Sequence, residues 1–261
     1  MKSFNIPLRF NPKNTFDTFV VSRGNNLTFA AAKAVADTPG EAYNPLLLVG
    51  GTGLGKTHLL HAIGNHVGGH QKRSRQKRLK VAYYSAEGFT NEYIKYIQAN
   101  QIKKFREQCR QNDLLLIDDI QSLAGRERIQ EELFHTFNTL QAAQKQIVLT
   151  CARPLSEIHG MEHRLVSRFE WGLVIKIQPP DMATRVAILQ EKARAMDFVL
   201  PENIIRFLAQ RIHTNVRRLE GALIRVASNA KLTGKTPTIK TVESLLRAIL
   251  SEPGRHYCLY G

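Results

Sequence analysis

The stretch Asn44–Thr57 contains the residues with the clearest chemistry. It reads NPLLLVGGTGLGKT and matches the phosphate-loop pattern G-x-x-x-x-G-K-[ST] at each defined position. Its glycines allow a tight turn that directs successive backbone N–H groups at one anion. Lys56 can reach the β- and γ-phosphates of a nucleotide, and the Thr57 hydroxyl can hold Mg²⁺. A plain glycine turn between a strand and a helix is the alternative, but the apolar run before and the helical pattern after are the context that the motif requires. The predicted nucleotide contacts are Gly51, Gly53, Gly55, Lys56, Thr57 and His58, for ATP or ADP with Mg²⁺.

Two acidic residues, Asp118 and Asp119, follow the apolar run Leu114–Ile117. Such a run predicts a strand buried on both faces, and parallel sheets bind ligands at the carboxyl ends of their strands. Asp118 can therefore hold Mg²⁺, and Asp119 can orient or deprotonate an attacking water. Capping of the following helix is the alternative function of this pair.

Apolar runs that alternate with helical patterns position these groups. Strands are predicted at residues 46–49, 81–84, 114–117, 147–149 and 173–177. The alternation indicates an α/β fold with a parallel sheet. Between the strands predicted at 81–84 and 114–117, the spacing of Phe89, Tyr93 and Ile97 predicts a helix with these residues on one face. After Pro179 only helical patterns follow, so we expect an α/β domain over residues 1–178 with an extended N-terminal segment. A helical domain over 179–250 and a tail over 251–261 complete this division.

The composition indicates an intracellular protein with anionic partners. The 37 Lys and Arg residues exceed the 22 Asp and Glu residues by 15. This excess favours nucleic acid, nucleotide or an acidic phospholipid surface as a partner. The cysteines (Cys109, Cys151 and Cys258) have neither disulfide nor zinc spacing, and the chain lacks a long apolar run, so we expect a cytoplasmic location. The basic stretch 72–80 is either a solvated loop or a nucleic-acid contact.

Four longer motifs resemble the bacterial chromosomal replication initiator family DnaA. They read GGTGLGKTHLLHAIGN, LLLIDDIQSLAGRERIQEELFHTFNTL, RLVSRFEWGL and NVRRLEGAL. The resemblance runs from about Phe10 to Leu250 and implies a P-loop NTPase core of the AAA+ class, followed by a small all-helical lid domain. It also implies head-to-tail self-association that depends on ATP.

The resemblance implies further roles by position. Arg168 matches the arginine finger that reaches the nucleotide of a neighbouring subunit, with Arg164 as a second candidate. Arg217 matches the lid arginine that contacts the nucleotide of its own subunit. Ile94 and Arg128 match positions that contact single-stranded DNA in a central channel.

The sequence departs from the family pattern in three respects. Ala152 stands where the family has a polar sensor residue, so we expect ATP binding with slow turnover. Arg218 replaces a common Glu beside Arg217. The third departure is the lack of the family's N-terminal domain and helix-turn-helix domain, so duplex origin reading is not expected.

These departures leave two alternative functions open. One is a regulator similar to Hda, which acts on the nucleotide of a full-length initiator at the sliding clamp. The other is an ATPase that loads the replicative helicase. The leading interpretation is an initiator core that binds and opens origin DNA.

Overall fold

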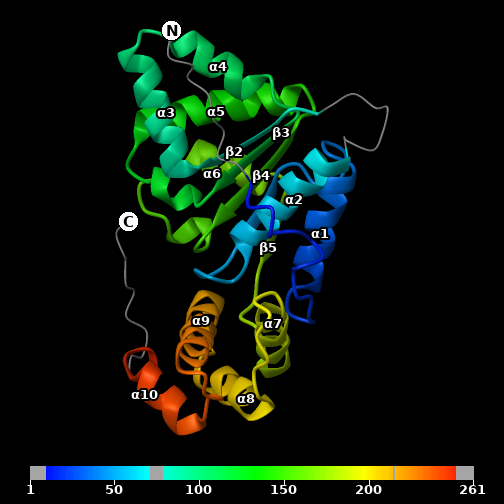
Figure 1. The fold of residues 1–261 in the computed structure, drawn as a ribbon. Coiled ribbons are helices and arrows are strands. Elements are labelled where there is room, and N and C mark those ends of the chain that lie inside the picture. Colours follow the sequence, from blue (N-terminus) through cyan, green and yellow to red (C-terminus); the bar gives the residue numbers. More distant parts are fainter. Residues whose placement is uncertain (1–9, 71–78, 214, 251–261) are drawn as a thin grey trace. The chain divides into compact units, whose positions relative to one another are not determined.

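The computed structural model describes residues 10–70, 79–213 and 215–250. The chain divides into two compact units, Met1–Gln178 and Pro179–Gly261 (Figure 1). The basic stretch at 72–78, Cys258 and the expected tail at 251–261 lie outside the described residues.

The first unit is built on a five-stranded sheet in the order β2-β3-β4-β1-β5, in which every neighbouring pair is parallel. The strands are β1 (Leu46–Val49), β2 (Val81–Ser85), β3 (Leu114–Asp118), β4 (Gln146–Cys151) and β5 (Leu173–Lys176). All four residues of β1 and all residues of β3 and β4 are buried, as expected for parallel strands covered on both faces. The strand that precedes the phosphate loop thus lies inside the sheet, between β4 and β5.

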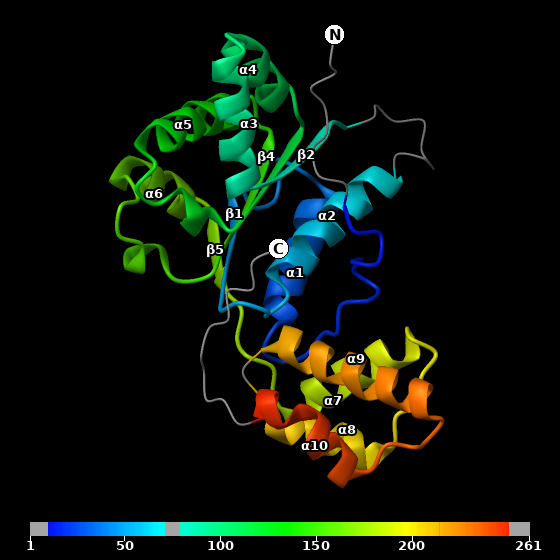
Figure 2. The same ribbon diagram turned by 60° about the vertical axis from the view of Figure 1, so that its left-hand side comes forward.

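Helices cover both faces of this sheet (Figures 1 and 2). Successive side chains of a strand point to opposite faces, and the core divides accordingly. Leu46 and Leu48 pack with α1 (Asn26–Asp37) and α2 (Lys56–His70). Leu47 and Val49 pack on the other face, beneath four helices and two 3-10 turns. These are α3 (Ala86–Gln98), α4 (Ile102–Arg110), η1 (Ile120–Leu123), α5 (Glu127–Ala142), η2 (Leu155–Glu157) and α6 (His163–Glu170).

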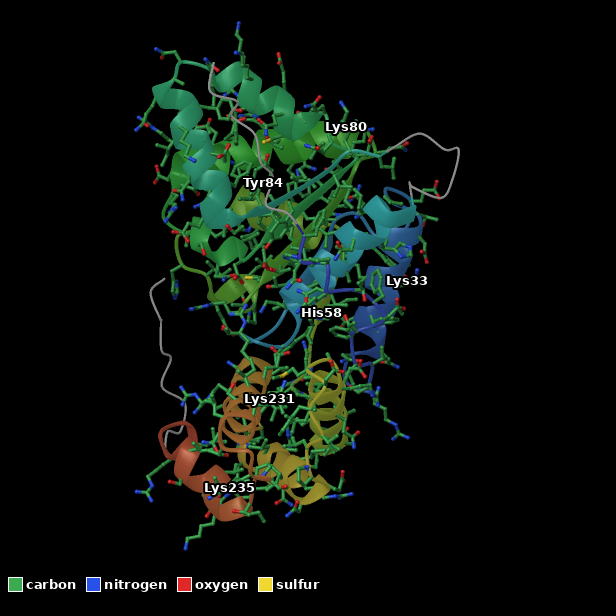
Figure 3. The ribbon with its side chains drawn as sticks, viewed as in Figure 1. Lys33, His58, Lys80, Tyr84, Lys231 and Lys235 are labelled. Carbon is green, nitrogen blue, oxygen red and sulfur yellow. The ribbon has the colours of Figure 1, made fainter. Side chains whose placement is uncertain are left out.

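An irregular segment, residues 10–25, lies along α2, and we name it the N-terminal strap. The α2 side chains of His58 and Asn65 donate hydrogen bonds to strap carbonyls, His58 to that of Thr15 at 2.8 Å. Phe10 packs against Gly64 so closely that a Cβ added there would lie 2.2 Å from the ring. Figure 3 shows His58 on this helix.

The second unit contains α7 (Met182–Arg194), α8 (Glu202–Arg211), α9 (Val216–Thr233) and α10 (Ile239–Leu250). These helices share their own apolar core, which includes Leu208, Leu223 and Val226. The Asn215 side chain caps α9 by accepting hydrogen bonds from the backbone N–H groups of Arg217 and Arg218.

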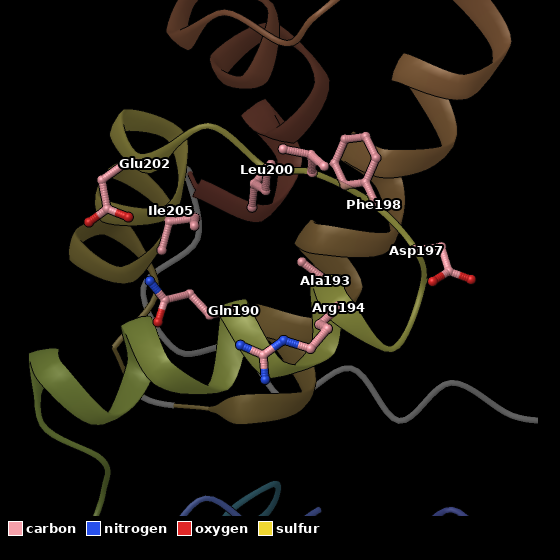
Figure 4. Close-up of a pocket in the computed structure, with 9 residues that line it drawn as sticks. Gln190, Ala193, Arg194, Asp197, Phe198, Leu200, Glu202 and Ile205 are labelled. Carbon is pink, nitrogen blue, oxygen red and sulfur yellow. The ribbon is translucent and has the colours of Figure 1, made fainter.

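Figure 4 shows a pocket of about 550 Å³ in this helical unit. Its lining comes from the end of α7, the α7–α8 connection and the start of α8, and includes Arg194, Phe198 and Glu202. None of the nucleotide, metal or arginine-finger residues predicted from the sequence lines it.

Candidate nucleotide site

The phosphate loop joins β1 to α2 and holds its backbone in a conformation that needs glycine. Gly53 and Gly55 have φ values of 80° and 94°, in the left-handed region. At Gly55 a Cβ would also lie 2.9 Å from the Phe19 ring of the strap. Gly55 is therefore required both by its backbone angle and by close packing.

Lys56 is almost buried, with 5% of its surface exposed. Its Nζ donates hydrogen bonds to the carbonyl oxygens of Gly50 at 2.7 Å and Gly51 at 3.0 Å. The ammonium group is thus held over the loop by the loop's own carbonyls. A cation in this position attracts an anionic phosphate chain.

Asp118 is buried at the end of β3 and accepts hydrogen bonds from three hydroxyl groups. Thr57 Oγ1 donates to Asp118 Oδ2 at 2.7 Å, and the Tyr83 hydroxyl donates to the same oxygen at 3.3 Å. Thr150 donates to Asp118 Oδ1 from the end of β4. The structure therefore brings together Thr57 and Asp118, the two predicted Mg²⁺ ligands.

Asp119 follows in a left-handed conformation, with φ 57° and ψ 52°. Its backbone N–H donates to Thr150 Oγ1 at 2.9 Å. Asp is one of the few non-glycine residues that adopt this region readily. The Thr150 hydroxyl therefore holds both acidic residues, one through its carboxylate and the other through its backbone.

Two titratable side chains beneath this site have shifted pKa values. Burial and the neighbouring Asp118 charge raise the pKa of Tyr83, so its hydroxyl remains a hydrogen-bond donor to Asp118. Burial lowers the pKa of His61, although the Asp118 charge acts in the opposite direction. The rings of His61 and Tyr83 are 4.7 Å apart.

The residues of the phosphate loop and Asp118 fit a nucleoside triphosphate with Mg²⁺. The phosphate loop supplies backbone N–H donors and Lys56, while Thr57 and Asp118 supply oxygen ligands of the kind that Mg²⁺ prefers. The described residues contain no cluster of three or more His, Cys, Asp or Glu that could hold a metal ion without a nucleotide.

The predicted arginine finger and its alternative lie on α6, against α5. The Arg164 guanidinium lies 4.9 Å from the Phe134 ring centroid, and that of Arg168 lies 6.0 Å away. Arg168 also donates to Gln141 Oε1 at 3.4 Å, and Arg164 pairs with Glu162. Their recorded contacts are with α5 and Glu162 rather than with the phosphate loop.

Three further predicted site residues are exposed. Arg217 lies in the first turn of α9, in the helical unit. Ile94 of α3 is 43% exposed, and Arg128 lies in the first turn of α5. Their roles toward nucleotide and DNA stay predictions.

Sequence reasoning missed three residues of the site: Tyr83, Gln121 and Thr150. Gln121 Oε1 accepts a hydrogen bond from the Ala152 backbone N–H at 3.0 Å. A usable signal existed for Thr150, because it ends a buried strand and polar side chains at the carboxyl ends of parallel strands meet at one edge.

The comparisons with known proteins show the family of the chain. The bacterial DnaA ATPase domain family matches residues 10–176. Domain III of the Thermotoga maritima replication initiation protein DnaA matches with a TM-score of 0.88 and 41% identity, over 93% of this chain and 99% of that one. AMPPCP-bound DnaA from Aquifex aeolicus matches with a TM-score of 0.79 and 37% identity, over 92% of this chain and 70% of that one. A DnaA bound to AMPPCP and single-stranded DNA matches with a TM-score of 0.77 and 37% identity, over 92% and 69%.

More distant matches share the fold alone. They include the Thermotoga maritima RuvB Holliday junction branch migration motor, at 19% identity over 90% of this chain and 72% of that one, with a TM-score of 0.64. No described helix is long and apolar enough to cross a membrane. The extent of the match over residues 10–176, together with the fold, shows that the chain belongs to the bacterial DnaA ATPase domain family, with an AAA+ P-loop core.

Proposed function

We propose that the chain binds ATP with Mg²⁺ and assembles head to tail to bind and open origin DNA. The observation that carries this proposal is the joined pair of Thr57 and Asp118 beside the nearly buried Lys56. The AMPPCP and single-stranded DNA bound by similar initiators support it. These matches are to initiators, and no observation favours the regulator or the helicase loader.

Each residue of the site has a role in this proposal. Thr57 and Asp118 hold Mg²⁺, which neutralises phosphate charge, and Asp119 orients the attacking water. Arg217 contacts the nucleotide of its own subunit. Arg168 is supplied to the nucleotide of the next subunit, and such a guanidinium makes assembly depend on ATP.

Head-to-tail assembly is tested by light scattering of the chain with Mg²⁺ and either ATP or ADP. We expect large assemblies in ATP and small species in ADP, because only ATP offers a γ-phosphate to Arg168 of a neighbour. Arg168→Ala should abolish the ATP-dependent assemblies. The control Arg206→Ala, an exposed residue paired with Glu202 on α8, should leave them unchanged.

Two outcomes would contradict the proposal. The parent could remain equally small in both nucleotides, which would exclude nucleotide-driven assembly. Alternatively, Arg168→Ala could assemble as the parent does, which would remove Arg168 from the interface.

A further inference from the structure

The side chain of Ala152 cannot donate a hydrogen bond to a phosphate, although it stands at the end of β4, beside the phosphate loop. The Gly50 N–H, at the start of the loop, donates to the Cys151 carbonyl oxygen at 3.0 Å. The next backbone N–H, that of Ala152, belongs to the same peptide group. This peptide group therefore lies directly beside the phosphate loop.

The N–H of this peptide group points away from the loop and is hydrogen-bonded to the side chain of Gln121. The Ala152 N–H donates to Gln121 Oε1 at 3.0 Å. A backbone N–H can only donate, so the accepting atom must be the carboxamide oxygen. The assignment of oxygen and nitrogen in this side chain is thus decided by chemistry, and the Nε2 group with its two hydrogens occupies the other branch of the carboxamide.

Nothing else within the described part of the chain uses this Nε2 group as a hydrogen-bond donor. Gln121 is half-buried and follows Asp119 by two residues, in the 3-10 turn η1. Asp119 is tied to β4 through Thr150, two residues before Ala152. Gln121 is therefore held from two directions, by η1 and by the Ala152 N–H, close to Asp119 and separated from Gly50 of the loop by one peptide group.

We infer that Gln121 is the residue that distinguishes ATP from ADP in this chain, through its Nε2 group, in place of a polar side chain at 152. The inference rests on the proposed binding of ATP at the phosphate loop. A neutral amide is suited to this role because it donates to an anionic oxygen without a charge of its own. A carboxylate at the same place would repel that oxygen.

The test compares binding of AMPPCP and ADP, each with Mg²⁺, by calorimetric titration of the parent and Gln121→Glu. The substituted carboxylate keeps an oxygen that can accept from the Ala152 N–H, but it loses the donor. We expect the Kd for AMPPCP to rise about tenfold or more, the typical effect of a hydrogen bond to a charged group, with the Kd for ADP within about twofold. Gln98→Glu, an exposed position on α3, adds the same charge elsewhere and should change neither constant.

A second pair of variants removes the donor without adding charge. Gln121→Leu should also weaken AMPPCP selectively, and adding Ala152→Asn to it should restore part of the lost affinity by supplying a new amide. This pair decides the question if Gln121→Glu does not fold, as judged by its thermal unfolding.

The outcomes separate this inference from the proposed function. If the parent binds neither AMPPCP nor ADP, the proposed function fails and the inference fails with it. If the parent binds both but the Gln121 variants lose both equally, or lose neither, the role of Gln121 is overturned while nucleotide binding stands.

Discussion

His61 joins the N-terminal strap to the nucleotide site through one neutral imidazole ring. Its Nδ1 accepts a hydrogen bond from the Asn11 backbone N–H at 2.7 Å, which requires that nitrogen to carry no proton. Its ring packs edge-on against Phe10 and Tyr83, and only 8% of the residue is exposed. Protonation of His61 would therefore cost a strap hydrogen bond.

The free energy of unfolding should fall when the solution is acidified below pH 6.5. The unfolded chain takes up the His61 proton near its ordinary pKa of 6.5, whereas the folded chain, whose pKa is lowered by burial, resists it until a lower pH. Stability is thus present above pH 6.5 and is lost as the pH falls toward the folded pKa. The loss from one proton is at most about 1.4 kcal/mol per pH unit.

Urea unfolding of the parent and His61→Asn between pH 7.5 and pH 5 measures this effect. The variant keeps an acceptor but does not titrate, so its stability should depend less on pH in this range. Equal pH dependence in the two proteins would show that another group is responsible.

Among the residues of the nucleotide site, the sequence predicts those that belong to a motif. It does not predict those that reach the site only because their strands are neighbours in the sheet. The pattern of the phosphate loop predicts Lys56 and Thr57 as site residues, and the strand end predicts Asp118, which the structure places in contact with Thr57. Tyr83 and Thr150 meet Asp118 only because β2 and β4 flank β3 in the sheet. Strand order cannot be read from spacing along the chain, so the contact of Tyr83 could not be predicted, and for Thr150 only its place at the end of a strand could be recognised.

Because the strap packs on α2 at Gly64 but not at Gly68, substitution by alanine should change the stability of the fold in opposite directions at these two positions. Gly64→Ala places a methyl group 2.2 Å from the Phe10 ring, whereas a Cβ at Gly68 meets nothing within 4 Å. Alanine in a helix interior is favoured over glycine by about 1 kcal/mol. We therefore expect Gly68→Ala to stabilise the fold by about this amount and Gly64→Ala to destabilise it.

Thermal and urea unfolding of the two variants provides this comparison, with each serving as the control of the other. Phe10→Ala combined with Gly64→Ala should reverse the sign of the Gly64 effect, because the clash is removed. A stabilising Gly64→Ala in the parent would mean that Phe10 does not pack on α2.

Secondary-structure elements could be predicted where apolar residues form a clear pattern, as in the five strands. The short helices α4 and α6 bury only two apolar residues each and were not predicted. The aromatic side chains that α3 buries are Phe89 and Tyr96, while Ile97 is 43% exposed. Two turns of a helix contain about seven residues, which is the spacing from Phe89 to Tyr96. Ile97, eight residues after Phe89, is therefore turned away from the face that Phe89 and Tyr96 share.

The whole molecule has a large positive charge, which gives its proposed contact with DNA a measurable signature. The excess of 15 basic residues predicts that binding of single-stranded DNA weakens as salt is added, because each neutralised phosphate releases counterions. If Arg128 contacts a phosphate, Arg128→Ala should lower the slope of log Kobs against log salt by about 0.7.

Fluorescence anisotropy of a labelled oligo-dT strand in ATP over a salt series measures this slope. Arg206→Ala removes an equal charge from an exposed position on α8 and should leave the slope unchanged. Equal slopes for the parent and both variants would exclude Arg128 as a phosphate contact.

The place of β1 between β4 and β5 also determines what the last residues of the first unit contact. The Ile177 backbone N–H donates to the Val49 carbonyl oxygen at 2.7 Å, one residue before the phosphate loop begins at Gly50. The division between the units falls just after Gln178. The pairing of β1 with β5, together with this hydrogen bond, therefore fixes the last residues of the first unit to the residue that precedes the phosphate loop.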